Sequence, residues 1–496
     1  MTDHAETGGE LSRSLRSGLD PGLEVMEDAV AVTTRKDSAK LSLGAASWSL
    51  YEGARDPYVI IITIYVFGPY FATVVVGDAV KGQTLVANIA MIYGLCVAFT
   101  GPLLGASIDM IGRRKPLLLL MTALMVPLLF ALWWVKPAGG GLGLGVSSLV
   151  LGLLGLFFAY SELLHNSMLT RAATPKQAPF ASGLALSLGN FFSVFMLVFV
   201  LWAFALPGKV DWSFIPKHPL FGLDPLKHET DRIVGPLVAV VLVVLSIPLF
   251  LFTPDAPRGE VGLFTALSKG FEGLKATLRT LKSHRSAAIF LGSRMLYTDG
   301  MTAILVFTGV YAAGVMHWHT LELLAFGILL SIFAVAGGQL GAVLDATVGP
   351  KRSVQIEILG ASVCLAGQLG MGPNQIFYLP YNTAAHAVLW HGPLFRTLPE
   401  AVYLMIGCCS AVFVCAQYAS SRTFLTRLAP PGQSASFFGL YALSGTVTVW
   451  LGSALVRIFT GVFKSQQAGF APIAMLLVLG FIGMLFVKHD GKEGTV

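Results

Sequence analysis

Charged residues are scarce in this sequence, and several catalytic motifs are missing from it. Only 12% of the 496 residues are Asp, Glu, Lys or Arg, whereas soluble domains contain about 25%. The sequence has no Gly-x-x-x-x-Gly-Lys-Ser/Thr phosphate-binding loop, no zinc-protease motif and no Gly-x-Ser-x-Gly nucleophile motif. We therefore expect a membrane protein that is not an enzyme, needs no cofactor and does not draw energy from nucleotide hydrolysis.

Cysteines are also few, and their positions argue against a disulfide framework. All five lie inside long apolar runs and lack the paired, loop-borne spacing of disulfides or zinc ligands: Cys96, Cys364, Cys408, Cys409 and Cys415. We interpret them as small packing residues. Four histidines are scattered through two predicted loops without the spacing of a metal site: His317, His319, His386 and His391.

Apolar residues make up 55% of the chain and form runs long enough to cross a bilayer. A helix needs about 20 apolar residues to span the hydrocarbon core. The runs predict twelve spans near 47–77, 85–108, 116–135, 146–170, 180–205, 233–253, 287–314, 320–343, 353–371, 399–421, 434–460 and 468–487. We expect an all-α integral membrane protein.

The positive charges predict the side on which each loop lies. With both termini cytoplasmic, 22 of the 33 Lys and Arg residues fall on the inner side, 8 on the outer side and 3 within spans. This asymmetry follows the positive-inside rule and does not point to nucleic acid. The first 46 residues lack the basic and apolar regions of a signal peptide, so we expect disordered cytoplasmic tails at 1–46 and 488–496.

Two groups of residues in the first half of the chain recur in the second half. The first group, Gly101, Gly105 and Asp109, recurs as Gly337, Gly341 and Asp345, at an offset of 236 residues. The second group, Arg171, Pro175, Gln177, Gly183 and Leu184, recurs as Arg427, Pro431, Gln433, Gly439 and Leu440, at an offset of 256 residues. The shared order predicts a duplicated six-span unit, with bundles at 47–253 and 287–487.

The first repeated group has a physical interpretation. Glycines four residues apart let two helices approach closely. The acid at the helix end precedes basic residues. An ion pair between them would hold the protein in one conformation, and we call these residues the latch. Its members are Asp109, Arg113 and Arg114 in the first half and Asp345, Lys351 and Arg352 in the second. The alternative is that the bases only orient the loops.

The segment between the bundles, 254–286, is basic and carries an amphipathic pattern. Its apolar residues step by three and four: Phe264, Leu267, Phe271, Leu274, Leu278 and Leu281. This pattern predicts a helix lying on the inner membrane surface as a linker, and a helix that docks a partner is the alternative.

Three ionisable residues lie in the first apolar run. Glu52, Arg55 and Asp56 are spaced i, i+3, i+4 and therefore share a helix face. At 1.5 Å per residue, Arg55 lies about 12 Å inside the start of the run. Its side chain either reaches back to the cytoplasmic surface or faces a solute cavity, because a charge at mid-membrane costs about 2.5 to 3.5 kcal/mol. We favour the cavity.

The spans numbered four, seven and ten carry most of the remaining polar residues. They are Tyr160, Glu162, His165 and Asn166; Arg294, Tyr297 and Asp299; and Gln417 and Tyr418. The i, i+3, i+4 spacing places Glu162, His165 and Asn166 on one face, and the depth of Glu162 predicts a pair with Arg55. Three other ionisable residues near span ends, Glu322, Glu357 and Arg457, are expected to reach the membrane surface.

The duplicated bundles and the basic motif after span two resemble the major facilitator superfamily over about residues 45–490. Within it, the chain resembles a group of fungal vacuolar amino-acid effluxers and their bacterial relatives. The residues that carry this resemblance are Trp48, Tyr51, Glu52, Pro57, Tyr58, Asn166, Leu169, Arg294-Met-Leu-Tyr297-Thr-Asp299-Gly300 and Phe437-Phe438-Gly439-Leu440-Tyr441. The chain departs from the group at Glu52, where Asp is usual, and at Leu169-Thr170, where Leu-Pro is usual.

The resemblance implies a major facilitator fold, a cavity lined by spans 1, 4, 7 and 10, and secondary transport of a small polar or zwitterionic solute such as an amino acid. It also implies a monomer in a bacterial cytoplasmic membrane, with a small solute and membrane lipid as its partners. Alternatives are a transporter of an amphipathic lipid and a receptor or assembly factor that does not transport.

The polar residues of the spans then have predicted roles. A carboxyl among apolar groups takes up a proton more readily than one in water. Glu162 and Asp299 are therefore candidates for proton coupling, while Arg55 and Arg294 are candidates for holding an anionic group. The alternative for each is a fixed ion pair that orders the bundle.

Overall fold

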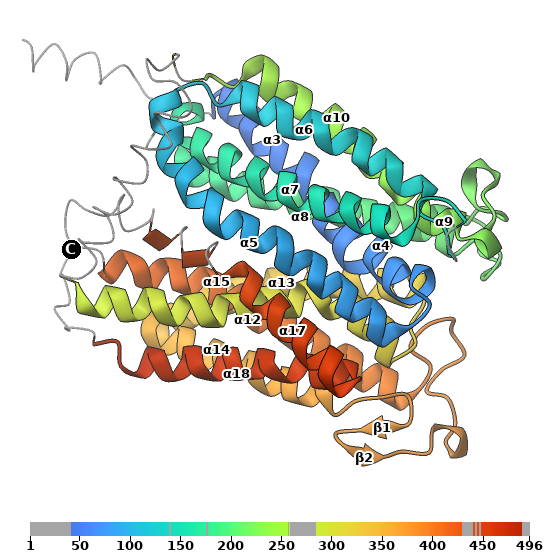
Figure 1. Ribbon diagram of the computed structural model, residues 1–496. Helices are drawn as coiled ribbons and strands as arrows, with labels where there is room; N and C mark the ends of the chain where they lie inside the picture. The colour runs from blue at the N-terminus through green and yellow to red at the C-terminus, as the bar shows by residue number, and fades with distance from the viewer. Residues whose placement is uncertain are drawn as a thin grey trace, which may run out of the picture.

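The computed structural model describes residues 41–137, 140–174, 177–255, 257, 284–428, 440–441, 444–445 and 448–488. In this part of the chain almost all regular structure is helical, as Figure 1 shows. A helix satisfies every backbone hydrogen-bonding group internally, which is a requirement for a segment that crosses lipid.

The N-terminal bundle contains six spans. Span one comprises α3 (Leu43–Pro57), the π-helical segment η1 (Tyr58–Tyr65), α4 (Phe67–Tyr70) and the π-helical segment η2 (Phe71–Val75). The other spans are α5 (Ala79–Ile111), α6 (Lys115–Ala131), α7 (Leu144–Ala172), α8 (Ala178–Val200) and α10 (Val234–Phe252). Short turns η3 (Leu132–Trp134), η5 (Leu201–Ala205), η6 (Leu220–Gly222), η7 (Pro225–Lys227) and α9 (Glu229–Arg232) extend or connect them.

The C-terminal bundle repeats this plan. Its spans are α12 (Arg285–Val315), α13 (Thr320–Thr347), α14 (Pro350–Leu369), α15 (Leu398–Leu428), α17 (Val449–Phe463) and α18 (Gln466–Leu485). The loop between α14 and α15 carries the turn η8 (Thr383–Ala385) and a small antiparallel hairpin of β1 (Gln375–Ile376) and β2 (Leu379–Pro380).

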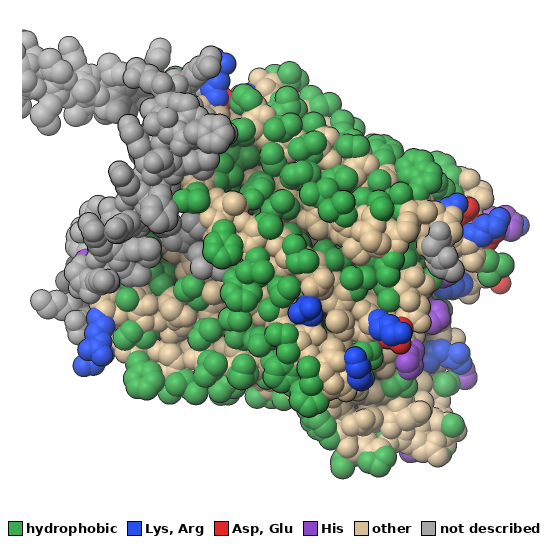
Figure 2. Space-filling model, viewed as in Figure 1, with side chains coloured by type: hydrophobic (Ala, Val, Ile, Leu, Met, Phe, Trp, Pro, Cys, Tyr) green, Lys and Arg blue, Asp and Glu red, His purple; other side chains and the backbone are tan. Residues whose placement is uncertain are grey.

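Twelve spans are present in the described part of the chain. Ten helical segments are long and apolar enough to cross a membrane. The other two are α14, which is more polar, and α17, whose described part is short. Figure 2 shows apolar side chains along the sides of the helices, with charged side chains and histidines gathered mainly at the end that carries α9 and the loops.

Several helices extend beyond the apolar runs from which they were predicted. The first begins at Leu43, because the Ser42 side chain accepts a hydrogen bond from the backbone of Ala45 and caps the helix. The prediction of disorder up to residue 46 is therefore wrong for its last four residues. The ends of an apolar run mark where contact with lipid stops. The helix itself can extend further, until a capping residue ends it.

Two other predictions fall largely outside the described residues. The amphipathic linker helix lies within 258–283, which is not described. Span eleven was predicted to begin at 434, and the described helix α17 begins at Val449. The bundle boundaries otherwise agree, with α10 ending at Phe252 and α12 beginning at Arg285.

The two bundles meet along α5 and α17 and along α8 and α13, as Figure 1 shows for the first pair. At the outer end, span one also packs against α12, where a side chain on Gly309 would overlap the Ile64 carbonyl oxygen. The Tyr65 ring packs edge-on against Phe326 of α13, with 6.3 Å between ring centroids. Close approach of the bundles at this end therefore depends on a glycine and on one aromatic pair.

Hydrogen bonds reinforce this outer contact. Gln83 of α5 donates to the Thr460 hydroxyl at 2.8 Å and accepts from Gln466 at 3.1 Å. The Thr320 hydroxyl, at the start of α13, donates to the Asp231 carboxylate at 2.6 Å. These bonds join the N-terminal bundle to the C-terminal bundle at the end of the molecule that carries α9 and the α14–α15 loop, which the positive-inside rule predicts to be the outer side.

Candidate functional site

Arg55 of α3 lies at the centre of a cluster of carboxylates. Its guanidinium is 2.5 Å from Glu52 Oε1, 3.3 Å from Glu162 Oε2 on α7 and 3.8 Å from Asp56 Oδ1. The Phe158 ring lies 4.7 Å from the guanidinium carbon. Because Arg55 is only 3% exposed, its side chain does not reach the membrane surface. The predicted Arg55–Glu162 pair is present.

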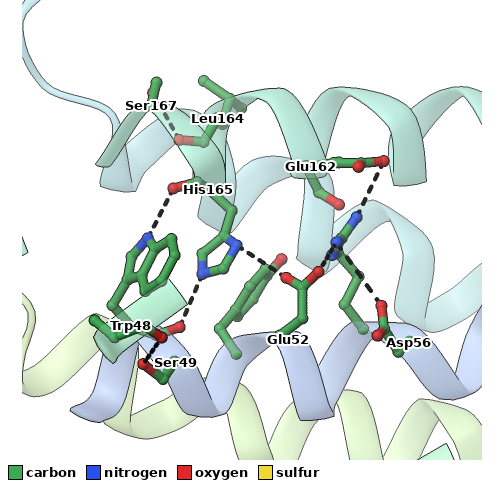
Figure 3. Close-up of polar contacts among 12 residues, drawn as sticks. Trp48, Ser49, Glu52, Asp56, Glu162, Leu164, His165 and Ser167 are labelled. Carbon is green, nitrogen blue, oxygen red and sulfur yellow. Dashed lines mark hydrogen bonds and ion pairs between the residues drawn. The ribbon is translucent and has the colours of Figure 1, made fainter. Parts of the chain in front are cut away.

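His165 of α7 lies on the other side of Glu52 (Figure 3). Its ring stacks on Trp48, with centroids 4.5 Å apart, and is fully buried. The Trp48 indole N–H donates to the His165 carbonyl at 2.8 Å, and His165 Nε2 lies 2.8 Å from the Trp48 carbonyl. This reciprocal pair of bonds ties α3 to α7.

Glu162, His165 and Asn166 were predicted to share one face of the helix, but their surroundings differ. Glu162 and Asn166 are exposed, whereas His165 faces α3. Residues spaced i, i+3, i+4 cover a broad stripe of helix surface. His165 lies at one edge of this stripe, where Trp48 and Tyr51 pack on its ring and bury it.

The imidazole of His165 contacts two groups of α3. Nε2 lies 2.8 Å from the Trp48 carbonyl oxygen, and Nδ1 lies 3.2 Å from Glu52 Oε2. Glu52 therefore has the Arg55 guanidinium on one side and an ionisable ring on the other.

The three acids of the cluster differ in exposure. Glu162 is 49% exposed, Asp56 is 28% exposed and Glu52 is 13% exposed. Asp56 points towards α8, where a side chain on Gly189 would overlap its carboxylate. Glu162 is thus the most exposed acid of the cluster. The Tyr160 hydroxyl on the same helix bonds the Thr100 hydroxyl of α5 at 2.5 Å.

Arg294 of α12 has no carboxylate partner among the described residues. Its Nη1 donates to the Tyr441 carbonyl at 2.8 Å and to the Ser444 hydroxyl at 2.6 Å. The guanidinium lies over the Tyr441 ring, 3.5 Å from the centroid, and Nε has no hydrogen-bond partner in the described part of the chain. Arg294 keeps a full positive charge that no described acid neutralises.

Asp299 occupies a separate position on α12. Its Oδ2 accepts from the Gly452 backbone N–H of α17 at 2.6 Å, and the side chain is 4% exposed. No ion pair between Asp299 and Arg294 is formed in the described structure, so the alternative of a fixed pair does not apply to these two residues.

The other predicted residues of α12 and α15 form two hydrogen-bonded groups. The Tyr297 hydroxyl bonds Ser421 at 2.9 Å, and Ser421 accepts from Gln417 at 2.7 Å. The Tyr418 hydroxyl bonds Thr302 at 3.1 Å. The structure thus brings spans seven and ten together through neutral groups, while spans one and four meet through charged ones.

The latch residues are only partly described. The side chain of Asp109 lies outside the described part, and its role stays a prediction. Arg114 donates from Nη1 to the Ser167 carbonyl at 2.6 Å, and its backbone N–H donates to Asp255 at 2.9 Å. Asp255 also accepts from the Lys115 backbone N–H at 3.2 Å. This carboxylate at the N-terminus of α6 was not identified from the sequence, because it lies about 140 residues away along the chain.

In the second copy no ion pair joins Asp345 to Lys351 or Arg352 among the described residues. Asp345 Oδ1 is buried without a hydrogen-bond partner there. The glycines of the motif behave as predicted, since side chains on Gly337 and Gly341 would meet the backbone of α15 at Val412 and Ala416. They allow α13 and α15 to approach closely.

Sequence reasoning misplaced one further acid. Glu357 of α14 is completely buried and accepts a hydrogen bond from Ser420 of α15 at 2.7 Å. The prediction that its side chain reaches the membrane surface is wrong. Position near a helix end suggested a surface residue, but the neighbouring helix covers this side of α14.

Solved structures of known transporters share this fold. The nucleoside transporter NupG superimposes with a TM-score of 0.61 at 14% identity, covering 90% of this chain and 100% of that protein. The inward-open xylose transporter XylE of E. coli gives a TM-score of 0.57 at 13% identity, covering 91% and 96%. At this identity the likeness concerns the fold alone.

Curated relatives are found among fungi. Autophagy-related protein 22 of Yarrowia lipolytica is 24% identical over 247 residues, which is 49% of this chain and 38% of the relative. The protein of the same name from Coccidioides immitis is 24% identical over 292 residues, 54% of this chain and 45% of the relative. The match thus spans less than half of each relative's length.

A family model described as "Vacuole effluxer Atg22 like" matches residues 181–494, well over half of the chain. The match begins in α8 and includes all of the described C-terminal bundle. The polar groups of α12 and α15 lie within it, whereas the Arg55 cluster precedes it. This chain belongs to the Atg22-like vacuole effluxer family.

Proposed function

We propose that this protein is a secondary transporter that moves a small polar or zwitterionic solute across a membrane by alternating access. The observation that carries the proposal is the half-exposed Glu162, paired with a buried Arg55, in a molecule whose bundles are joined at the predicted outer side. A charged group at membrane depth is costly unless it serves a pathway or a partner.

The charges suggest how a solute with two charged ends would bind. The N-terminal cluster contains three carboxylates and one arginine, and it presents Glu162 to solvent. The C-terminal bundle contributes Arg294, whose positive charge has only neutral partners among the described residues. An ammonium group would bind near Glu162 and an anionic group near Arg294, which matches a zwitterion such as an amino acid.

The energy would come from a gradient. Asp299 is buried and accepts a hydrogen bond from one backbone N–H, and Glu52 Oε2 lies 3.2 Å from His165 Nδ1. Both arrangements support coupling to protons, with no cofactor required. The proposed transport cycle needs no chemical change of the solute, so we propose that the protein is not an enzyme.

The membrane and the orientation are also proposals. The basic residues place both termini on the cytosolic side. The expected bacterial inner membrane finds no support in the relatives, which are fungal proteins of a family described as vacuolar. Localisation of a tagged full-length chain in its own cells decides between a cell membrane and an organelle membrane.

The test is solute-induced current in proteoliposomes with an inward pH gradient, screened across amino acids and small peptides. We expect one solute to give a pH-dependent current that is lost in Glu162→Gln and Asp299→Asn. Glu322→Gln, at the outer end of α13, is the matched control, since Glu322 caps its own helix away from the cluster. Absence of current and of solute counterflow from the folded protein across the whole panel would contradict the proposal.

A further inference from the structure

Glu357 is a buried acid outside the cluster to which we assigned solute binding. It lies on α14 and is 0% exposed. Oε1 accepts from the Ser420 hydroxyl of α15 at 2.7 Å, whereas Oε2 is buried without a hydrogen-bond partner among the described residues. One oxygen of this carboxyl is therefore desolvated and unsatisfied.

No positive charge compensates Glu357 in the described structure. The ionisable side chains that interact with it electrostatically are Asp345 of α13 and Tyr297 of α12, and neither is a cation. The helix α18 also packs against α14 and contains no titratable residue. On α14 itself, Lys351 and Arg352 precede Glu357 by more than one turn and form no ion pair with it.

The surroundings favour a neutral carboxylic acid. An ionised carboxylate buried without a counter-ion loses its hydration, and here it would also be repelled by Asp345. A protonated carboxyl carries no net charge, and its hydrogen bond to Ser420 is retained. The geometry is thus suited to holding a proton.

Glu357 is connected both to the candidate site and to the inner side. Its partner Ser420 is adjacent to Ser421, which bonds Tyr297 of α12 at 2.9 Å. Asp345 lies two residues before the inner end of α13 and is partly exposed, with a buried Oδ1 that lacks a partner in the described part. Movement of α15 relative to α14 would change the Ser420 contact, and Asp345 offers a path for the proton to the inner solution.

We propose that Glu357 is a second proton-binding site of the C-terminal bundle, in addition to Asp299, filled when the outer side is closed and exchanging with the inner solution past Asp345. The step is reversible binding of one proton to a carboxylate, and no other bond changes. The proposal rests on the transport function proposed above, because a bound proton couples to a solute only if the bundles alternate.

The first test needs no solute. Infrared difference spectra of the full-length protein in lipid, recorded during pH titration in H2O and in D2O, detect the carbonyl stretch of a carboxylic acid. We expect a deuterium-sensitive acid band that changes with pH, loses one component in Glu357→Gln and is unchanged in Glu322→Gln. Ser420→Ala is expected to shift the band without removing it, because it deletes the hydroxyl partner of Oε1. The proposal is wrong if the wild-type protein shows no acid band that changes with pH, or if the band of Glu357→Gln is the same as that of the wild type.

The second test asks whether this proton controls the bundles. In a background without the native cysteines, Asn166→Cys places a thiol at an exposed position of α7. We expect maleimide labelling of this thiol to change with pH, and the change to disappear with Glu357→Gln and persist with Glu322→Gln. If labelling of this thiol responds to pH equally in the wild type and in Glu357→Gln, then Glu357 stays protonated throughout and does not couple proton binding to movement of the bundles. If both tests succeed while no solute gives current, the proton site stands and the solute proposal fails.

Discussion

In the N-terminal bundle Arg55 has three carboxylates within ion-pair distance, whereas in the described part of the C-terminal bundle Arg294 has only neutral oxygens as partners. The two bundles descend from one duplicated plan, and the 256-residue offset aligns Glu162 with Tyr418 and His165 with Ser421. The two ionisable residues that α7 contributes to the cluster therefore correspond to hydroxyl groups in the second bundle. Duplication preserved the helix packing while the chemistry of the two halves diverged.

This difference changes what a mutation removes. A buried charge in an ion network loses several compensating interactions at once, and its partners become unpaired charges. A buried charge bound to neutral groups leaves only neutral groups behind. The same substitution in the two bundles should therefore have unequal consequences.

The largest expected effect is that of Arg55→Met. It leaves Glu52, Asp56 and Glu162 close together without a guanidinium, so we expect a loss of about 3–5 kcal/mol in the free energy of unfolding. Titration with sodium dodecyl sulfate in mixed micelles measures the change, and Arg457→Met, at an exposed position, is the control. A loss similar to that of the control would show that the cluster is not needed for stability.

Arg294→Met should cost less, about 1–3 kcal/mol, because it removes two hydrogen bonds to neutral oxygens, the Tyr441 carbonyl still accepts from the Ser444 hydroxyl, and no carboxylate is left unpaired in the described structure. The same titration measures it. If Arg294→Met destabilises the protein as much as Arg55→Met, the contrast between the bundles is wrong, and Arg294 has an acidic partner outside the described residues.

The repeated glycine motif offers a matched pair of variants. A side chain at Gly337 would overlap the Val412 carbonyl oxygen, whereas one at Gly101 would meet Val97 and Leu163 at 3.6 and 3.8 Å. We expect Gly337→Ala to destabilise the protein by about 1–3 kcal/mol, since α13 and α15 must move apart. Gly101→Ala should be neutral or stabilising by up to about 1 kcal/mol, through its higher helix propensity. Thermal unfolding of both variants in the same detergent tests this; equal midpoints would contradict it.

The smallest expected effect on stability is that of Glu162→Gln. Glu162 is 49% exposed and Arg55 retains two other carboxylates, so the change should lower the free energy of unfolding by no more than about 1 kcal/mol. Solute-driven current should nevertheless be lost, because the residue that faces the solute has been neutralised. A variant that is as active as the wild type would remove Glu162 from the binding site.

Several features of this protein follow from local sequence alone. The length of the apolar runs requires membrane-spanning helices, and the bias of Lys and Arg sets their direction. The two repeated groups reveal the duplication, and the depth of Arg55 and Glu162 in their spans is enough to predict their pairing. These properties depend on spacing along one helix or on composition, which the sequence displays directly.

Other features were decided by packing between helices. His165 is buried because Trp48 and Tyr51 cover it, Glu357 is buried because α15 covers α14, and Arg294 binds Tyr441 and Ser444 instead of the nearby Asp299. A helical sequence shows which residues share a face but not which neighbouring helix occupies it. Burial and the choice of partner depend on the rotation of each helix against the others, and that rotation is settled only when all the spans pack together.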